Sequence, residues 1–354
     1  MHRFDRSRRL FGLCAGSLLL GAGGGGWPAD ATAAANGNAR PGAALRIAVG
    51  GQGGLFYLPL TAAERLGYFQ NEGLRVEILD FAGGSPAMDA VREARADVGC
   101  GGYEQLLEQQ AGGFACRSLA LMGRTLQLAL AASQRFWPHK SFTSYKGLRI
   151  GVPALGSSAQ FFASLWLLQM GVSPDAVSFV GVGNGRQALA AIRQGRVHAL
   201  SHVDPLITLL EQKNEVRILA DTRTLKGSQD FFGGPMPGAC LYAPRAFVEH
   251  RSSEAQGMVN AIVHALKWMQ TAGPADLARI IPMQYWLDDR AAYLAAFEKV
   301  RESLSPDGLM PGEGPATALR SIARLRASRA APDVDLSLTY SNEWVRRAKL
   351  KFQL

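Results

Sequence analysis

Charged residues are scarce in this chain, and long hydrophobic runs are absent after its first thirty residues. Charged residues make up 19% of the chain and hydrophobic residues 47%. This balance excludes intrinsic disorder, which requires low hydrophobicity and high net charge. Because no later stretch of about 18 or more apolar residues occurs, a polytopic membrane protein is excluded too. The remaining class for 354 residues is a globular α/β protein with roughly two domains.

The motifs that catalytic and metal sites require are also missing. No Cys-x-x-Cys pair is present for zinc or thioredoxin-like chemistry, and no Gly-x-Ser-x-Gly nucleophile motif occurs. The run 151–158 resembles a phosphate-binding loop, but Ser157 stands where that loop needs a lysine. His198 and His202 lie on a predicted strand, where four residues span roughly 13 Å, too far to share one metal. We therefore predict a protein that is not an enzyme and binds no metal or cofactor.

The N-terminus has the pattern of an export signal. Four arginines precede an apolar run over 10–26, and small residues follow at Ala29-Asp30-Ala31. The run 7–11 is similar to the twin-arginine export pattern. We predict a cleaved signal over 1–31, a flexible leader over 32–43 and a periplasmic location; the alternative is a retained N-terminal anchor. Cys100 and Cys116 could then form a disulfide, leaving Cys240 unpaired, but three buried thiols are favoured.

Alternating strand, glycine loop and helix patterns fill most of the remaining chain. One series runs over 45–121 and a second over 147–220, separated by an aromatic, turn-rich stretch over 136–146. This alternation predicts two lobes, each a parallel sheet with helices on both faces. Helices are predicted over 248–270, 274–281, 289–304 and 316–328. The net charge is +9, but the basic residues are spread along the chain, so no nucleic-acid partner is expected.

Five loops that leave predicted strands and enter helices are the candidate ligand-binding region. Ligands of open parallel sheets bind at such loops, where free N–H groups of helix N-termini favour anionic or carbonyl-rich groups. The alternative is ordinary tight turns in which Ser85 and Ser157 are N-caps. We expect the ligand between 83–85 and 156–158, with Tyr57 and Tyr103 as aromatic walls and Arg124 as the nearest cation. The predicted binding residues are Gly53, Phe56, Tyr57, Gly84, Ser85, Gly102, Tyr103, Glu104, Arg124, Gly156, Ser157, Ser158, His202 and Asp204.

Several motifs, in order, resemble one family of solute-binding proteins. They cover almost the whole chain after the predicted signal: Leu58-Pro59-Leu60 through Gly67-Tyr68-Phe69 to Glu72-Gly73-Leu74, then Ala96-Asp97-Val98-Gly99, Tyr145 to Val152 with Gly156-Ser157-Ser158, Gly195 to Leu200, and Thr339-Tyr340-Ser341-Asn342-Glu343. The chain is thereby similar to periplasmic substrate-binding proteins of ABC importers for nitrate, sulfonates, taurine and thiamine-pyrimidine precursors. It departs from the family's common pattern at Tyr103-Glu104 and at His198, so the resemblance leaves the ligand open.

The resemblance implies a type II periplasmic binding fold, in which two α/β lobes are joined by two crossover strands. One lobe would comprise 44–126 and 237–354 and the other 127–236, with crossovers near 124–129 and 239–243. The implied function is capture of a small organic or oxyanion solute and its delivery to a permease in the inner membrane, by a protein expected to be a monomer. Alternatives are an enzyme on the same fold, such as a pyrimidine-precursor synthase or a chorismate-type dehydratase, and a periplasmic sensor subunit.

Overall fold

The computed structural model describes residues 44–136, 145, 147–326 and 333–353. The predicted export signal over 1–31 and the leader over 32–43 lie outside these residues, as does most of the turn-rich stretch over 136–146. Within the described part, no helix is both long and apolar enough to cross a membrane. Cys100, Cys116 and Cys240 are free and buried, which confirms the prediction of three buried thiols.

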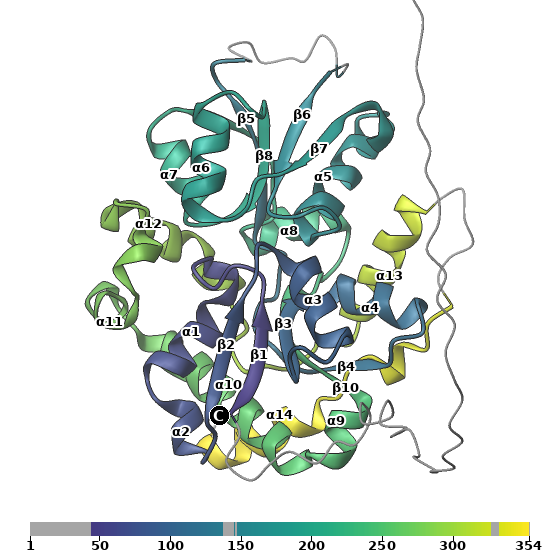
Figure 1. Ribbon diagram of the computed structural model, residues 1–354, viewed down its shortest axis with the longest axis vertical. Coiled ribbons are helices and arrows are strands. Elements are labelled where there is room, and N and C mark those ends of the chain that lie inside the picture. The colour runs from purple at the N-terminus through teal and green to yellow at the C-terminus, as the bar shows by residue number, and fades with distance from the viewer. Residues whose placement is uncertain (1–43, 137–144, 146, 327–332, 354) are drawn as a thin grey trace, which may run out of the picture. The chain divides into compact units, whose positions relative to one another are not determined.

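The first sheet contains five strands in the order β2-β1-β3-β10-β4 (Figure 1). Strand β1 pairs in parallel with β2 and β3, whereas β10 runs antiparallel to both β3 and β4. The core on one side of this sheet is buried against α10 (Ser252–Thr271), whose Val259, Ile262, Val263 and Leu266 are fully buried. Its strands are β1 (Leu45–Val49), β2 (Val76–Asp80), β3 (Val98–Gly102), β4 (Cys116–Leu121) and β10 (Ala239–Pro244).

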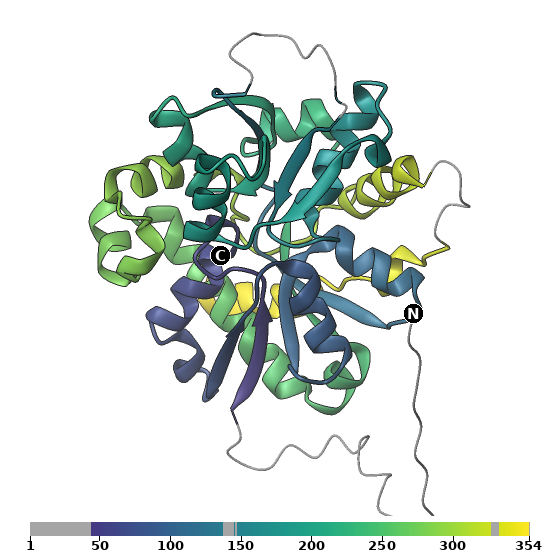
Figure 2. The ribbon, with the colours of Figure 1, turned by 45° about the horizontal axis from the view of Figure 1, so that its top comes forward.

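The second sheet also contains five strands, in the order β7-β6-β8-β5-β9, and it stays separate from the first in both ribbon views (Figure 2). Strand β6 pairs in parallel with β7 and β8, and β5 runs antiparallel to β8 and β9. Its strands are β5 (Leu128–Ser133), β6 (Arg149–Val152), β7 (Ser178–Gly181), β8 (Ala199–Val203) and β9 (Val216–Asp221).

The antiparallel strands β5 and β10 correct the prediction of purely parallel sheets. Each is the strand by which the chain enters one sheet after leaving the other. The chain leaves one sheet at the carboxyl end of a parallel strand. It enters the other sheet at the edge formed by the carboxyl ends of that sheet's parallel strands. The entering strand must therefore run in the opposite direction. The crossings lie between Leu121 and Leu128 and between Asp221 and Ala239. The second crossing comes earlier than predicted, because 239–243 already belongs to β10.

Helices cover both faces of each sheet. In the first lobe α10 packs against α1, α2 and α14, while α3 and α4 pack against the strands. In the second lobe α5, α6 and α7 contact β8. These helices are α1 (Leu58–Arg65), α2 (Tyr68–Asn71), α3 (Gly84–Arg92), α4 (Tyr103–Ala111), α5 (Ser158–Gln169), α6 (Gly185–Arg193), α7 (Leu206–Gln212), α8 (Leu225–Phe232), α9 (Arg245–His250), α10 (Ser252–Thr271) and α14 (Glu343–Phe352), with the 3₁₀ turns η1 (Leu55–Tyr57) and η2 (Pro174–Ala176).

Two C-terminal helices contact both lobes. Helix α12 packs against α7 and against η1, and α13 packs against both α4 and α5. The predicted helix over 289–304 is α12 (Arg290–Val300) followed by the 3₁₀ turn η4 (Arg301–Ser303). The remaining elements are α11 (Pro274–Ile280), η3 (Met283–Trp286), α13 (Gly314–Leu325) and η5 (Leu336–Leu338). The C-terminal segment thus bridges the two sheets as well as completing the first lobe.

Candidate functional site

Three helix N-termini meet where the two lobes touch. Helices α3 and α4 of the first lobe and α5 of the second each follow the carboxyl end of a strand. Across this boundary the Gln105 amide donates to the Gly156 carbonyl at 3.1 Å. The Asn184 amide donates to the Phe81 carbonyl at 3.2 Å. The lobes are therefore in direct polar contact around the starts of these helices.

Several of the predicted binding residues lie together at this boundary. We call them the helix-start cluster: Gly84, Ser85, Gly102, Glu104, Gly156, Ser157 and Ser158. A Cβ placed on Gly156 would lie 3.1 Å from the Ser85 hydroxyl of the other lobe. A Cβ on Gly102 would lie 2.4 Å from the Ser158 hydroxyl and 2.5 Å from a Glu104 carboxylate oxygen. The glycines permit this close approach of side chains from both lobes.

The polar side chains of the helix-start cluster are unusually short of partners. Ser157 is the N-cap residue of α5, but its side chain makes no capping hydrogen bond, and Ser85 lies inside α3 rather than at its N-cap. The buried hydroxyl oxygens of Ser85 and Ser157 and both carboxylate oxygens of Glu104 have no hydrogen-bond partner among the described residues. Buried polar atoms are nearly always paired, so such a concentration needs an explanation. N-capping does not explain these unpaired atoms, because neither serine side chain makes a capping hydrogen bond.

Glu104 is the fully buried acid of this cluster, with a side chain that is 0% exposed. Burial raises the pKa of its carboxyl from 4.5 to about 7, and the nearby Ser158 hydroxyl only partly offsets that effect. The carboxylate of Glu108 on the same helix raises the pKa further. Neither Glu104 oxygen receives a hydrogen bond of normal geometry from the described residues. Glu104 therefore titrates near neutrality.

A cavity of about 160 Å³ lies between the lobes, where the loops that follow β1 and β8 line it. Gly53, His202 and Asp204 of the predicted set line it, and we call it the interlobe cavity. Beside it, the backbone N–H of Leu55 donates to the Asp204 carbonyl of the other lobe at 2.8 Å. A cavity of 150 Å³ holds a molecule of benzene size, so this one suits a small solute.

The sequence did not single out four other residues that line the interlobe cavity: Asp80, Asn184, Gln284 and Tyr285. The Asp80 carboxylate accepts the backbone N–H groups of Gly51 and Gln52 at 2.8 and 3.0 Å. Asp80 ends β2 and Asn184 precedes α6. Their positions at a strand end and a helix start could have marked them as candidate binding residues. Tyr285 comes from the C-terminal helical region, and no local pattern marked it.

His202 is buried and its ring is satisfied within its own lobe. Its Nδ1 accepts the Val203 backbone N–H at 3.0 Å, and its Nε2 lies 3.4 Å from the Gly183 carbonyl. Burial lowers the pKa of His202, so the ring is neutral at pH 7. A neutral ring that accepts at Nδ1 donates at Nε2, which fits both contacts.

Three predicted aromatic residues are part of the hydrophobic core. Phe56 and Tyr57 pack edge to face, with ring centroids 5.0 Å apart, and belong to the core around α10. The Tyr103 hydroxyl lies 2.5 Å from the Thr339 hydroxyl, so it points toward η5 rather than toward the second lobe. Burial raises the pKa of Tyr57, and the carboxylates of Glu104 and Asp80 raise it further. Tyr57 therefore lies near both parts of the candidate site.

Arg124 lies in the first crossing, away from the helix-start cluster. Its guanidinium donates to the backbone carbonyl of Glu302 in η4. It lines two other cavities, neither of which shares a lining residue with the interlobe cavity. This placement differs from the expectation that Arg124 is the cation nearest the ligand, because the crossing turns its side chain toward the C-terminal segment.

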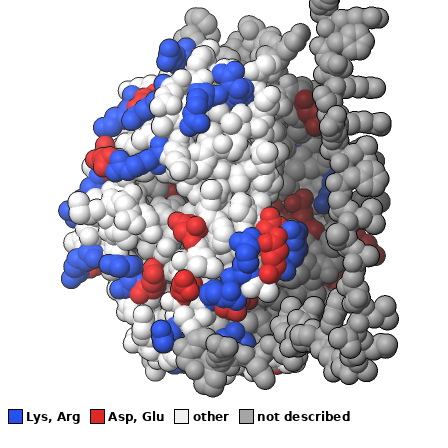
Figure 3. All heavy atoms as spheres, viewed as in Figure 1, with Lys and Arg blue, Asp and Glu red and all other residues white. Residues whose placement is uncertain are grey.

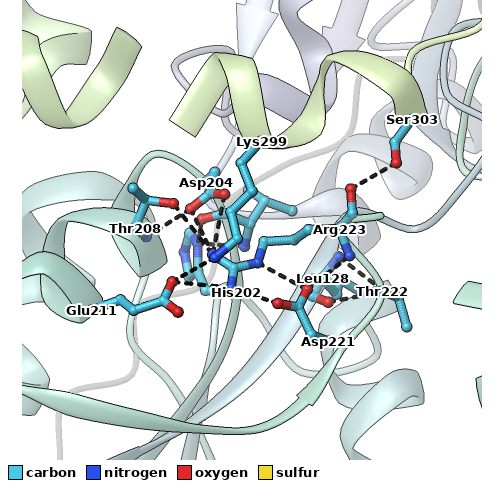
Figure 4. Close-up of polar contacts among 11 residues, drawn as sticks. Leu128, His202, Asp204, Thr208, Glu211, Asp221, Thr222, Arg223, Lys299 and Ser303 are labelled. Carbon is cyan, nitrogen blue, oxygen red and sulfur yellow. Dashed lines mark hydrogen bonds and ion pairs between the residues drawn. The ribbon is translucent and has the colours of Figure 1, made fainter. Parts of the chain in front are cut away.

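Asp204 belongs to a buried ionic network at the second crossing (Figure 4). Its carboxylate lies 3.3 Å from Arg223, whose side chain is 0% exposed and also pairs with Asp221 and Glu211. Burial raises the pKa of Asp204, an effect that the Arg223 charge opposes. From the first lobe, the Ser303 hydroxyl donates to the Arg223 carbonyl at 2.6 Å and Lys299 pairs with Glu211 at 2.8 Å. We call this group the hinge network.

The surface shows no comparable concentration of charge on the face drawn in Figure 3, where basic and acidic side chains are interspersed. Among the described residues, no group of three or more His, Cys, Asp or Glu side chains is arranged to hold a metal ion. The polar features that set this molecule apart are therefore the helix-start cluster, the interlobe cavity and the hinge network.

Comparisons with known proteins agree with this architecture. A family model described as NMT1/THI5 like matches residues 57–273. A solved structure from Bordetella bronchiseptica RB50 is 44% identical, with a TM-score of 0.86, over 88% of this chain and 98% of that one. The alkanesulfonate-binding protein SsuA from Xanthomonas axonopodis pv. citri, bound to MOPS, is 18% identical, with a TM-score of 0.63, over 86% of this chain and 97% of that one.

The periplasmic nitrate-binding protein NrtA from Synechocystis PCC 6803 is 12% identical, with a TM-score of 0.68, over 88% of this chain and 89% of that one. At such low identity, the likeness to the sulfonate and nitrate binders shows the fold alone. It confirms the predicted fold class of two α/β lobes joined by two crossings.

Proposed function

Because the chain belongs to the NMT1/THI5-like family, we propose that it is the solute-binding component of an ABC-type importer. It captures a small organic or oxyanion solute between its lobes in the periplasm and delivers it to a permease in the inner membrane. The lobes are those described above, near 44–126 with 237–354 and near 127–236. The predicted signal over 1–31 would carry the chain across the membrane.

One observation carries this proposal: unpaired buried polar groups from both lobes gather at the lobe boundary. Ser85 and Glu104 come from the first lobe and Ser157 from the second, and none of their side-chain oxygens has a hydrogen-bond partner among the described residues. Three helix N-termini surround them and supply free N–H groups. A solute bound there would satisfy groups of both lobes at once, which favours the closed arrangement through differential contacts.

Two crossings between the lobes support opening and closing. Hinge closure around a solute is one of the common conformational changes of two-lobed binding proteins. Direct contacts between the lobes include hydrogen bonds, such as Gln105 to Gly156 and Asn184 to Phe81, beside the packing of α12 and α13 against both lobes. The hydrogen bonds can break and re-form, because water replaces them when the lobes separate.

The first experiment is native mass spectrometry of protein purified from the periplasm without denaturation. We expect one small solute per chain that is released on unfolding, and small-angle scattering should give a smaller radius of gyration when it is added back. An enzyme on the same fold would convert the solute during incubation, so a released molecule of unchanged mass argues against that alternative. A radius that does not change at saturating solute would contradict closure.

Transport and export are tested in cells. Deleting the gene should abolish uptake of the released solute at micromolar concentration, and uptake that persists unchanged would contradict the importer role in favour of a sensor. Replacing both Arg8 and Arg9 with lysine should stop export by the twin-arginine route. Normal periplasmic yield of that variant would show that the chain uses the general secretion route instead.

A further inference from the structure

We propose that the cavity at the two crossings between the lobes is a second binding site, which takes a small organic acid with an apolar body and a single carboxylate. We call it the hinge cavity. Its volume of about 600 Å³ lies within the usual range of small-molecule sites. It shares no lining residue with the interlobe cavity or the helix-start cluster, so its ligand is distinct from the solute of the proposed function.

Both crossings of the chain line the hinge cavity. Arg124 and Thr125 come from the first crossing, and residues between 225 and 236 come from the second, mainly from α8. The remaining wall is the C-terminal segment over 305–311. Helix α8 lies at the level between the two sheets in Figure 1. A ligand in the hinge cavity therefore touches both connections between the lobes at once.

Two polar side chains of this lining have buried atoms without a partner. Ser228 is 3% exposed, and its hydroxyl oxygen has no hydrogen-bond partner among the described residues. The same holds for Nε of Arg124, although another nitrogen of this guanidinium donates to the Glu302 carbonyl. Buried polar atoms are nearly always paired, so two of them in one cavity wall call for a partner from outside the chain. A guanidinium N–H and a hydroxyl can both donate to a carboxylate.

The charges around the hinge cavity favour an anion with one negative charge. Its lining contains two cations, Arg124 and Lys226, and one acid, Asp307. Asp307 is paired with Lys349 at 2.5 Å, and Lys226 is paired with Asp230 at 2.5 Å. Arg124 is thus the lining charge that has no ion-pair partner among the described residues. A carboxylate matches the planar fork of a guanidinium, which can hold both of its oxygens.

The rest of the lining is mostly apolar. It consists of Leu225, Pro235, Met236, Pro306, Leu309 and Pro311. These side chains offer no hydrogen-bond donor, so they favour an apolar body attached to the carboxylate. A highly polar acid such as a sugar acid would lose water there without gaining hydrogen bonds in return.

Occupation of the hinge cavity is coupled to the arrangement of the lobes. The crossings change direction when the lobes open or close, so the walls of the cavity move relative to one another. A ligand that binds one arrangement more tightly shifts the population toward it. The inferred acid therefore acts on the hinge from a place outside the solute cleft.

The test uses two pairs of probes in which a carboxylate is replaced by a neutral amide: octanoate with octanamide, and indole-3-acetate with indole-3-acetamide. Isothermal titration compares the wild type with Arg124→Met and with Gln229→Trp, which fills the cavity from an exposed lining position. Gln229→Trp keeps Arg124 and its contact with Glu302, so a loss of binding in this variant does not come from a disturbed crossing.

The matched control is Arg117→Met. Arg117 also donates to a backbone carbonyl of the C-terminal segment, that of Leu338 at 3.2 Å, but it does not line the hinge cavity. We expect at least one acid to bind the wild type and the control about tenfold tighter than its amide. Arg124→Met and Gln229→Trp should each weaken binding of that acid by about tenfold or more.

Hydrogen exchange then locates the probe. The bound acid should slow amide exchange over 122–127 and 225–238, the two crossings. No binding of either acid, equal binding within both pairs, or affinity that survives in both Arg124→Met and Gln229→Trp overturns the inference. Slower exchange over 83–85 and 156–158 alone also overturns it, because the acid would then occupy the solute cleft. The solute-binding function is tested separately, by the solute released from periplasmic protein and by uptake.

Discussion

Arg223 and Glu104 are both charged side chains with no exposed surface, yet their surroundings are opposite. Arg223 in the hinge network donates to Asp204, Thr208, Glu211 and Asp221. Glu104 in the helix-start cluster has no ion pair among the described residues, and only the Ser158 hydroxyl and its own backbone N–H offset its burial. Desolvating a charge is costly in both places, but only at the hinge does the protein itself supply the compensation. The difference fits a structural role for Arg223 and agrees with the proposed place of Glu104 in the binding site.

Position in the fold explains why the two differ. The hinge network joins β9, α7 and the loop after β8 in the second lobe to η4 and α12 of the first lobe, beside the second crossing. The helix-start cluster joins α3 and α4 to α5 across the boundary between the lobes, which opens in the proposed function. A permanent ion pair across the seam would oppose opening. Under the proposed function, polar groups that a solute satisfies would make closure depend on binding instead.

The largest effect is expected from Arg223→Met, which removes the partner of the buried Asp204 carboxylate. Breaking one side of a buried ion pair typically costs about 3–5 kcal/mol of unfolding free energy, measured by urea denaturation. The exposed Arg245, which pairs with Glu249 on α9, supplies the control Arg245→Met, with a loss of roughly 1 kcal/mol or less. The double variant Asp204→Asn with Arg223→Met should recover part of the loss. Equal stability of both single variants would contradict the role of the hinge network.

The next effect concerns Glu104→Gln without solute, which should stabilise the protein at pH 8. A carboxyl whose folded pKa is raised from 4.5 to about 7 makes the folded state lose stability as pH rises between these values. The full difference corresponds to about 3 kcal/mol. Urea denaturation at pH 4.5 and pH 8 should therefore show a gain for Glu104→Gln at pH 8 and almost none at pH 4.5. The exposed Glu343, replaced by Gln, is the control. The absence of a gain at pH 8 would show that the surrounding protein compensates the Glu104 carboxylate.

A smaller effect is expected from Gly102→Ala, which tests how tightly the acid is enclosed. The added Cβ would lie 2.4 Å from the Ser158 hydroxyl and 2.5 Å from a Glu104 oxygen. Overpacking of this kind typically costs about 1–3 kcal/mol. Because the contact exists only when the lobes are closed, this cost would destabilise the closed state. Small-angle scattering should give a larger radius of gyration than for the wild type. Gly181→Ala is the control, since nothing lies within 4 Å of its added Cβ. Equal radii for both variants would show that the seam has room at Gly102.

The smallest effect is expected at an exposed pair that also spans the lobes. Arg186 on α6 pairs with Asp288, and the two side chains are 59% and 73% exposed. Water screens such a pair, so Asp288→Asn should leave the Tm within about 1 °C of the wild type at 0.15 M salt. A large fall in Tm would show that closure depends on surface charge rather than on the buried groups compared above.

Local patterns were sufficient to predict most strands and helices. The Leu45–Val49 strand has the predicted bounds, and the predicted helix over 274–281 is α11. Strand β5 was not predicted as such, because Leu128–Ser133 is apolar throughout and lacks the flanking glycine loop that marked the others. Helix α14 was not predicted either, since its charged residues make only a narrow apolar face, of which Val345 and Ala348 are buried.

In the candidate site too, residues in local sequence patterns were predicted, whereas residues placed by distant packing were not. Glycine loops at strand ends identified Gly84, Gly102 and Gly156, because strand ends and helix starts are visible in the sequence. Tyr285 was not predicted, since it reaches the interlobe cavity from 3₁₀ turn η3, far along the chain. Arg124 was expected near the ligand, but the direction of a side chain in a crossing depends on what packs against it, here the Glu302 carbonyl.

The sequence by itself determined the alternation of strands and helices, the two lobes, and which loops end at the carboxyl edges of the sheets. These follow from hydrophobic periodicity and from glycine positions, which act over a few residues. Only the tertiary structure decided that Glu104 is buried without a cation beside it while Arg223 has four hydrogen-bonding side chains around it. Whether a charge is paired depends on which residues from distant segments come within about 3 Å, and no local pattern encodes that distance.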